Sequence, residues 1–131
     1  MKFLLLQNYE GGAGCTVPMD QWAPDDIKAH IDFQHTLNKE LVDTGELVDA
    51  QGLAATAKFV TFDGAGSPVV TDGPFAEAKE LLAGYRMVDV ESEERAIEIA
   101  ARASAAPGYR GVPIQQPIEV RLVASAPSMD L

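Results

Sequence analysis

The order of expected helices and strands is the feature that most constrains the fold of this chain. Two long amphipathic helices are expected, one over residues 25–44 and one that begins after the cap residue Ser92. Strands are expected at residues 2–9, 46–53, 57–63, 69–71, 84–90 and 117–124. Without an inserted short strand and a short helix over 76–81, this order approaches βαββαβ, the ferredoxin-like arrangement of an α+β fold.

Local signals indicate where the helices begin and which side they bury. Pro24 followed by two acidic residues favours a helix start, and Gly45 is expected just beyond the helix end. The second helix is expected to bury a narrow stripe of mostly small residues, namely Ala96, Ile97, Ala100, Ala101 and Ser104. Two helices on one face of an antiparallel sheet leave the other face to be covered, and we therefore expect a homodimer.

Length and charge narrow the class of protein. The 131 residues suit a single domain over 1–131, with a frayed tail over 125–131. The net charge of -10 argues against binding to nucleic acid or to an anionic membrane surface, although a local arginine could still hold a small anion. The apolar run at residues 3–6 is too short for a signal segment or a membrane span, so a cytoplasmic location is expected.

Cysteine and histidine usage gives no reason to expect a metal or another cofactor. Cys15 is the only cysteine, which excludes an intramolecular disulfide and a cysteine-based zinc site. His30 and His35 are five residues apart on the first helix and therefore point in different directions, so a two-histidine metal site is not expected. His35 could instead pair with Asp32 on the helix surface.

Polar residues fall on the apolar side of the first expected helix. At about 100° per residue, one arc of this helix collects its apolar side chains. These are Ile27, Ile31, Phe33, Leu37, Leu41 and Val42. His30, Gln34 and Asn38 lie inside the same arc, where an unpaired buried polar group costs about 1–3 kcal/mol. They either bond to the sheet or line a wet cleft. His30 is accordingly a satisfied core or interface histidine, or a cleft histidine that performs acid–base chemistry.

Two arginines on expected strands have apolar neighbours. Arg86 and Arg121 could each form a salt bridge with one of the many carboxylates, or could anchor an anionic ligand. Together with Gln34, they are the candidate ligand-binding residues.

The run Asp72-Gly73-Pro74-Phe75 combines four residues with different conformational preferences. Asp72 can cap a turn or helix, glycine permits positive φ, and proline suits a first helical turn. The phenylalanine supplies an apolar anchor. A structural turn and a carboxylate that lines a pocket are both compatible with this run.

The run also carries a family resemblance. Residues 71–80, with residues 82–85 after them, resemble the signature of the DGPF branch of the YCII-related proteins, and the likeness extends over residues 2–123. The resemblance implies a ferredoxin-like fold that dimerises into an α/β barrel, with a cleft in which a histidine faces an aspartate. Ala29-His30-Ile31 resembles the start of that family's first helix, which makes His30 and Asp72 the implied catalytic pair.

Two departures from the family pattern lie near the end of the chain. The closing strand reads Val120-Arg121-Leu122 where a proline is expected after the arginine, and the segment 108–116 is longer than expected. Both could alter the rim of the cleft or the dimer edge. Two hypotheses follow: a cleft for an unknown small molecule, with acid–base chemistry by His30 and Asp72, or a non-catalytic sensor or accessory module. The second would accompany sigma-factor-type transcription regulators, to which some relatives are fused.

Overall fold

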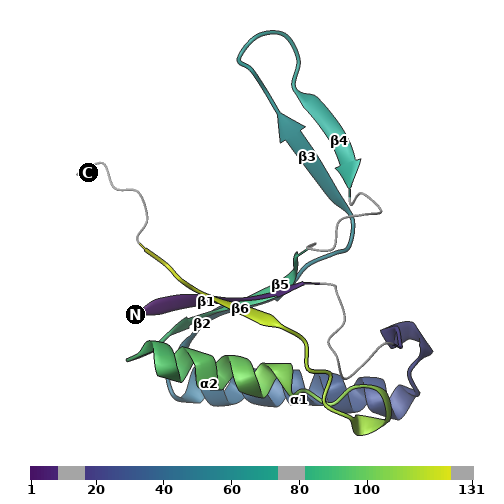
Figure 1. Cartoon of the computed structure of the whole chain (residues 1–131), viewed down its shortest axis with the longest axis vertical. Helices are drawn as coiled ribbons and strands as arrows, with labels where there is room; N and C mark the ends of the chain where they lie inside the picture. The colour runs from purple at the N-terminus through teal and green to yellow at the C-terminus, as the bar shows by residue number, and fades with distance from the viewer. Residues whose placement is uncertain (9–16, 74–81, 125–131) are drawn as a thin grey trace.

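The computed structural model describes residues 1–8, 17–73 and 82–124 (Figure 1). Four strands form the main sheet: β1 (Lys2–Asn8), β2 (Leu47–Gly52), β5 (Leu82–Asp89) and β6 (Ile118–Leu122). Helix α1 (Pro24–Asp43) follows β1, and helix α2 (Glu93–Ser104) follows β5. The strand order is β2-β5-β1-β6 with antiparallel neighbours, and both helices lie against the same face of the sheet. This α+β architecture is consistent with a ferredoxin-like fold.

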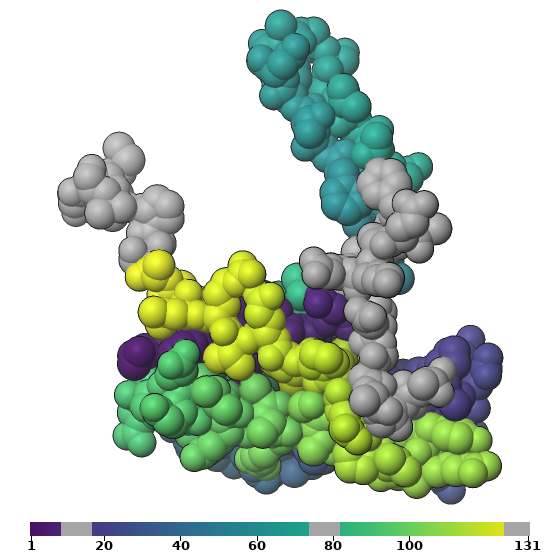
Figure 2. Space-filling model, in the orientation of Figure 1, coloured from purple at the N-terminus to yellow at the C-terminus, as the bar shows by residue number. Residues whose placement is uncertain are grey.

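The inserted segment forms a separate two-stranded sheet. Strands β3 (Ala57–Thr61) and β4 (Val69–Gly73) pair with each other and not with the main sheet. This hairpin, residues 57–73, is called the arm below, and it projects away from the sheet and helices (Figures 1 and 2). The expected short helix over 76–81 and the frayed tail over 125–131 lie outside the described residues.

The two helices begin and end by different devices. Ser92 caps α2, because its Oγ accepts a hydrogen bond from Arg95 N at 3.2 Å, whereas Ala23 at the N-cap of α1 makes no side-chain bond. Helix α1 ends as expected, with Gly45 at φ +77°. Glu46 N and Gly45 N bond back to the carbonyls of Leu41 and Val42, which is a Schellman motif.

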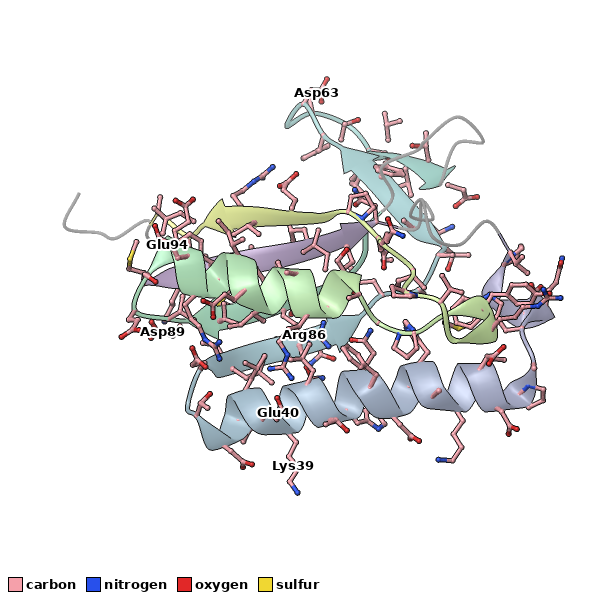
Figure 3. All side chains as sticks on the ribbon, turned by 60° about the horizontal axis from the view of Figure 1, so that its bottom comes forward. Lys39, Glu40, Asp63, Arg86, Asp89 and Glu94 are labelled. Atoms are coloured by element: carbon pink, nitrogen blue, oxygen red, sulfur yellow. The ribbon has the colours of Figure 1, made fainter. Side chains whose placement is uncertain are left out.

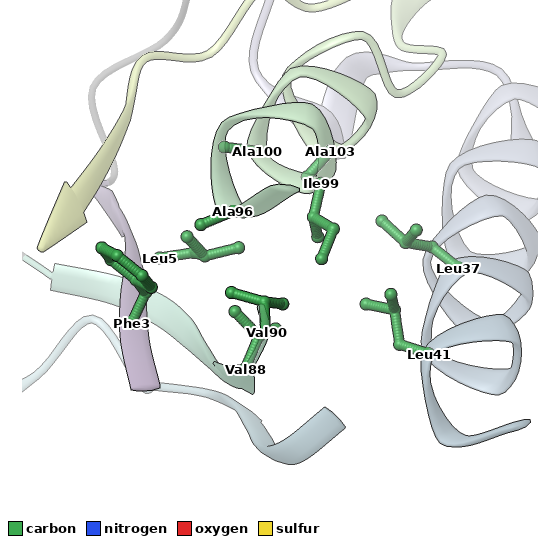
Figure 4. Packing of buried hydrophobic residues seen from close by; sticks show 10 residues of the cluster. All are labelled: Phe3, Leu5, Leu37, Leu41, Val88, Val90, Ala96, Ile99, Ala100 and Ala103. Atoms are coloured by element: carbon green, nitrogen blue, oxygen red, sulfur yellow. The ribbon is translucent and has the colours of Figure 1, made fainter. Parts of the chain in front are cut away.

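The core lies between the sheet and the two helices (Figure 4). Its buried side chains come from β1, β5 with its following residue, α1 and α2. They are Phe3, Leu5, Leu37, Leu41, Val88, Val90, Ala96, Ile99, Ala100 and Ala103.

The structure corrects the expected buried faces of both helices. On α2 the buried stripe is Ala96, Ile99, Ala100 and Ala103, while Ile97 is 53% exposed. This i, i+3, i+4, i+7 pattern is that of a helix packed on one side. On α1, Leu37 and Leu41 are buried, but Ile31 and Val42 lie at the margin of the arc and are exposed.

A second, smaller core fixes the segment after α2 against the start of α1. Trp22, Ala106 and Ile114 are buried together, and Trp22 Nε1 donates to the carbonyl of Val17 at 2.8 Å. Asp26 accepts a hydrogen bond from Arg110 N at 2.9 Å, which adds a second link between the two segments. The carbonyl of Pro107 is thereby held beside α1.

Candidate functional site

A cleft of about 300 Å³ lies between α1 and the β2–β5 side of the sheet. The described residues that line it come from both helix and strands, and one from the segment before β6. They are Gln7, His30, Gln34, His35, Asn38, Ala50, Gln51, Gly52, Ala83, Gly84, Tyr85, Arg86 and Gln116.

Small residues on the sheet make room for this cleft. Ala50 is the cross-strand partner of Arg86, and Gly52 is the partner of Gly84, with the pair of Gln51 and Tyr85 between them. A Cβ atom added at Gly52 would meet no atom within 4 Å, whereas one added at Gly84 would lie 2.9 Å from the carbonyl oxygen of Gln51. Backbone therefore forms part of this wall, and Gly84 is required by the close approach of β2.

Arg86 lies between the sheet and α1 (Figure 3) and is only 6% exposed. Its Nε donates to Asn38 Oδ1 at 2.7 Å, and its Nη2 donates to Gln34 Oε1. Among the described residues no carboxylate forms an ion pair with this guanidinium. Burial lowers the pKa of Arg86, because desolvation disfavours the charged form. The structure thus gives this arginine neutral amide partners in place of a salt bridge.

His30 is held in one tautomer by the main chain. Its Nδ1 lies 2.9 Å from the carbonyl oxygen of Pro107, which can only accept a hydrogen bond, so Nδ1 carries the proton. Trp22 contacts the imidazole edge-on, with ring centroids 5.6 Å apart at an interplanar angle of 74°. In the neutral imidazole, the lone pair is therefore on Nε2.

A single directed hydrogen-bond chain joins these groups. Arg86 donates to Gln34 Oε1, which leaves the amide nitrogen of Gln34 facing His30 Nε2 at 3.5 Å. His30 in turn donates from Nδ1 to Pro107. The contact at 3.5 Å is long, so Nε2 is only weakly engaged and is the atom that can accept a proton from a ligand in the cleft.

The other predicted site residues do not all join this cleft. His35 is exposed and lies at the rim, and Asp32 pairs with Lys28 instead. Asp72 lies on β4 of the arm, where its side chain is 80% exposed and forms an ion pair with Lys58. It is not among the described residues that line the cleft. Arg121 is exposed on β6 and pairs with Glu119.

Sequence reasoning missed several residues that contribute to the cleft. Gln7 lies on β1, Gln51 lies on β2 and Gln116 precedes β6, so only the tertiary fold brings them to the same place. The Pro107 carbonyl carries no side-chain signal at all. One signal did exist, because the segment 108–116 departs from the family pattern, and its last residue, Gln116, lines the cleft.

Within the described ranges, 1–8, 17–73 and 82–124, no three histidine, cysteine, aspartate or glutamate side chains gather as metal ligands. In the same ranges no helix has both the length and the apolar character needed to cross a membrane.

Comparison with known proteins identifies the family. The YCII-related domain matches residues 1–114, and the chain therefore belongs to the YCII-related family. An uncharacterized protein of Rhizobium meliloti (strain 1021) is 30% identical over 80 residues, which is 60% of this chain. The match spans 64% of that relative, less than two thirds of its length.

Proposed function

We propose that this YCII-related protein binds a small molecule in the cleft and that His30 transfers a proton to or from it. The observation that carries the proposal is the fixed tautomer of His30. Because Nδ1–H is used by the Pro107 carbonyl, the basic lone pair of Nε2 is available on the side of Gln34 and the cleft. A neutral histidine can serve as a general base and, once it is protonated, as a general acid.

Asp72 remains the proposed acid partner of His30, on the strength of the family resemblance. Lys58 competes for this carboxylate in the single chain, so Asp72 has to exchange or share that ion pair before it can assist an imidazole. The proposal also includes membership of the DGPF branch, which rests on the run Thr71-Asp72-Gly73 and the residues that follow it. It includes a cytoplasmic location as well.

A homodimer is part of the same proposal. The described helices cover one face of the main sheet, and the alternating residues Leu4, Leu6, Tyr85 and Met87 lie half-buried on the other face. The arm adds exposed apolar side chains at Val60, Phe62, Val69 and Val70. The resemblance to the DGPF branch and these apolar surfaces together favour a second copy of the chain as the partner that covers them.

The alternative is a non-catalytic ligand sensor or accessory module of sigma-factor-type regulation. Its support is the extent of bonding in the cleft, since Arg86 already bonds to both Asn38 and Gln34. Such a network also suits a site that only binds.

Substrate screening with variants separates the two functions. If His30 is the acid–base group, His30→Asn should lower turnover of any substrate found by about 10²–10⁴-fold, because that is the usual contribution of general acid–base catalysis. Asp72→Asn tests the partner in the same assay. Lys39→Ala, a substitution on the side of α1 that faces away from the sheet (Figure 3), is the control and should retain activity. Unchanged turnover in folded His30→Asn would remove the catalytic role, and ligand binding without turnover would favour the sensor.

A further inference from the structure

The cleft differs in charge from the rest of the chain. Aspartate and glutamate together number 20 against 10 lysines and arginines, and yet no carboxylate occurs among the described residues that line the cleft. The lining contains one arginine, two histidines and five amide side chains, the amides being Gln7, Gln34, Asn38, Gln51 and Gln116. Asp49 lies close by, since its carboxylate accepts hydrogen bonds from Tyr85 Oη at 2.7 Å and Gln51 Nε2 at 3.1 Å, but it is not itself among the described lining residues. The described lining thus contains a positive charge and no negative one, which suits an anion.

Arg86 is the positive centre of that environment. A guanidinium has five N–H donors, and the described bonds to Asn38 and Gln34 use two of them. Both of these partners are neutral amide oxygens, so they satisfy donors without balancing the charge. A buried charge with no counter-ion is costly, and an anion that enters the cleft would offset that cost.

We propose that the ligand of this cleft is a small organic carboxylate, whose two oxygens take remaining N–H donors of Arg86. Paired N–H donors of a guanidinium match the two oxygens of a carboxylate in a bidentate bond. The inference rests on the proposed binding of a small molecule in the cleft, but it does not depend on proton transfer by His30.

Charge balance favours a carboxylate over a phosphate. Arg86 supplies one positive charge, and the five amides supply none. A monoanion therefore neutralises the described cleft when its histidines are neutral, whereas a phosphate dianion leaves one negative charge in excess. The volume of about 300 Å³ lies at the small end of the usual range for ligand pockets, about 300–1,000 Å³, which suits a small molecule.

The test compares carboxylates with their neutral isosteres at constant ionic strength. Acetate, glycolate and benzoate are titrated into ¹⁵N-labelled protein, with acetamide, benzamide and inorganic phosphate as comparison probes. The carboxylates should give saturable shifts in the amide resonances of α1 and β5, the neutral amides should give none, and phosphate should bind more weakly. Equal binding of carboxylates and neutral amides, tighter binding of phosphate, or no saturable shift with any carboxylate would overturn the proposal.

Two variants assign the effect to Arg86. Asn38→Asp retains an oxygen acceptor for Arg86 Nε and adds a negative charge beside the guanidinium, so carboxylate affinity should fall at least about tenfold with the fold retained. Arg86→Met removes the charge with a side chain of similar length and should lower affinity likewise. Arg102→Met removes an arginine of α2 that pairs with Glu40 outside the described cleft lining, and this variant should bind carboxylates as the wild type does. Wild-type affinity in both cleft variants would contradict the proposal.

The binding and turnover assays can fail separately. Carboxylate binding that depends on Arg86, with no effect of His30→Asn on turnover, would support the ligand class and remove the catalytic role. Turnover of a neutral substrate that depends on His30, without carboxylate binding, would support the catalytic role and contradict the carboxylate ligand class.

Discussion

Glu46 connects the turn after α1 to the first turn of α2. Its carboxylate accepts bonds from Nε and Nη2 of Arg95, each at 2.9 Å, and from Thr44 Oγ1 at 2.8 Å. The side chains of Glu46 and Arg95 are 17% and 29% exposed. The hydrogen bonds from Arg95 are the main reason that the pKa of Glu46 is lowered, and partial burial opposes them.

This contact predicts a specific dependence of stability on pH. Because the pKa of Glu46 is lower in the folded state, its stabilising contribution is full above the unfolded value of about 4.5 and is lost as the pH falls through the folded pKa. Glu46→Gln should cost about 1 kcal/mol at neutral pH and should flatten the decline in the free energy of unfolding below about pH 5. Urea unfolding over a series of pH values measures both effects.

Asp32→Asn is the control for this prediction. Asp32 pairs with Lys28, and both side chains are more than half exposed, so the slope with pH should stay close to that of the wild type. A wild-type slope in Glu46→Gln would show that the Arg95 contact is not responsible.

At the same scale, part of the candidate site could be predicted from sequence. His30, Gln34 and Asn38 recur every four residues, so helix geometry alone puts them on one face of α1, and all three line the cleft. The two strand arginines could not be distinguished in this way. Alternation along a strand separates its two faces but does not identify the covered one, and only the sheet register directs Arg86 toward α1 and leaves Arg121 exposed.

At the scale of elements, the two helices offer a matched test of capping. Ser92→Ala should destabilise the protein by about 1 kcal/mol, because Arg95 N loses its side-chain acceptor. Ala23→Ser should stabilise it by about 0.5–1 kcal/mol, because α1 starts without a side-chain cap and already has Pro24 in its first turn. Thermal and urea unfolding of both variants measure the two changes in the free energy of unfolding, which should have opposite signs. Changes of the same sign would contradict the assignment of the two caps.

The elements themselves were largely predictable, since caps, prolines and glycines are local signals. Expected bounds for α1 differ from Pro24–Asp43 by one residue at each end. The phase of α2 was less predictable because alanine recurs around this helix, so hydrophobicity alone does not choose between Ile97 and Ile99. The pairing of β3 with β4 was also missed: the strands were expected, but the sheet they join is set by contacts between distant residues.

At the scale of the whole molecule, the arm is the part of the described chain that projects furthest from the main sheet and helices (Figure 2). A two-stranded hairpin is only marginally stable by itself in water. Val60 and Val70 are cross-strand partners on it and are 60% and 56% exposed.

These surfaces predict a homodimer that depends on the arm. Wild-type protein at micromolar concentration should have the mass of a dimer in size-exclusion chromatography with light scattering. Val60→Glu combined with Val70→Lys should shift it to a monomer, because the opposite charges keep the cross-strand pair while removing its apolar surface.

Val42→Lys is the matched control for this experiment, since Val42 is also 60% exposed but lies on α1. That variant should remain dimeric. A monomeric wild type would contradict the homodimer, and a dimeric arm variant would exclude the arm from the interface.

On the proposed binding function, two glycines in the wall of the cleft have a consequence for how ligand preference can diverge among related chains. Gly84 cannot gain a side chain without displacing the backbone of β2, so selectivity cannot readily change there. Gly52 faces open space on an edge strand, where an added side chain meets no steric obstacle and also reduces the entropy of the unfolded chain. Substitution at this one position can therefore narrow the range of accepted molecules while the hydrogen bonds of Arg86 and His30 stay intact.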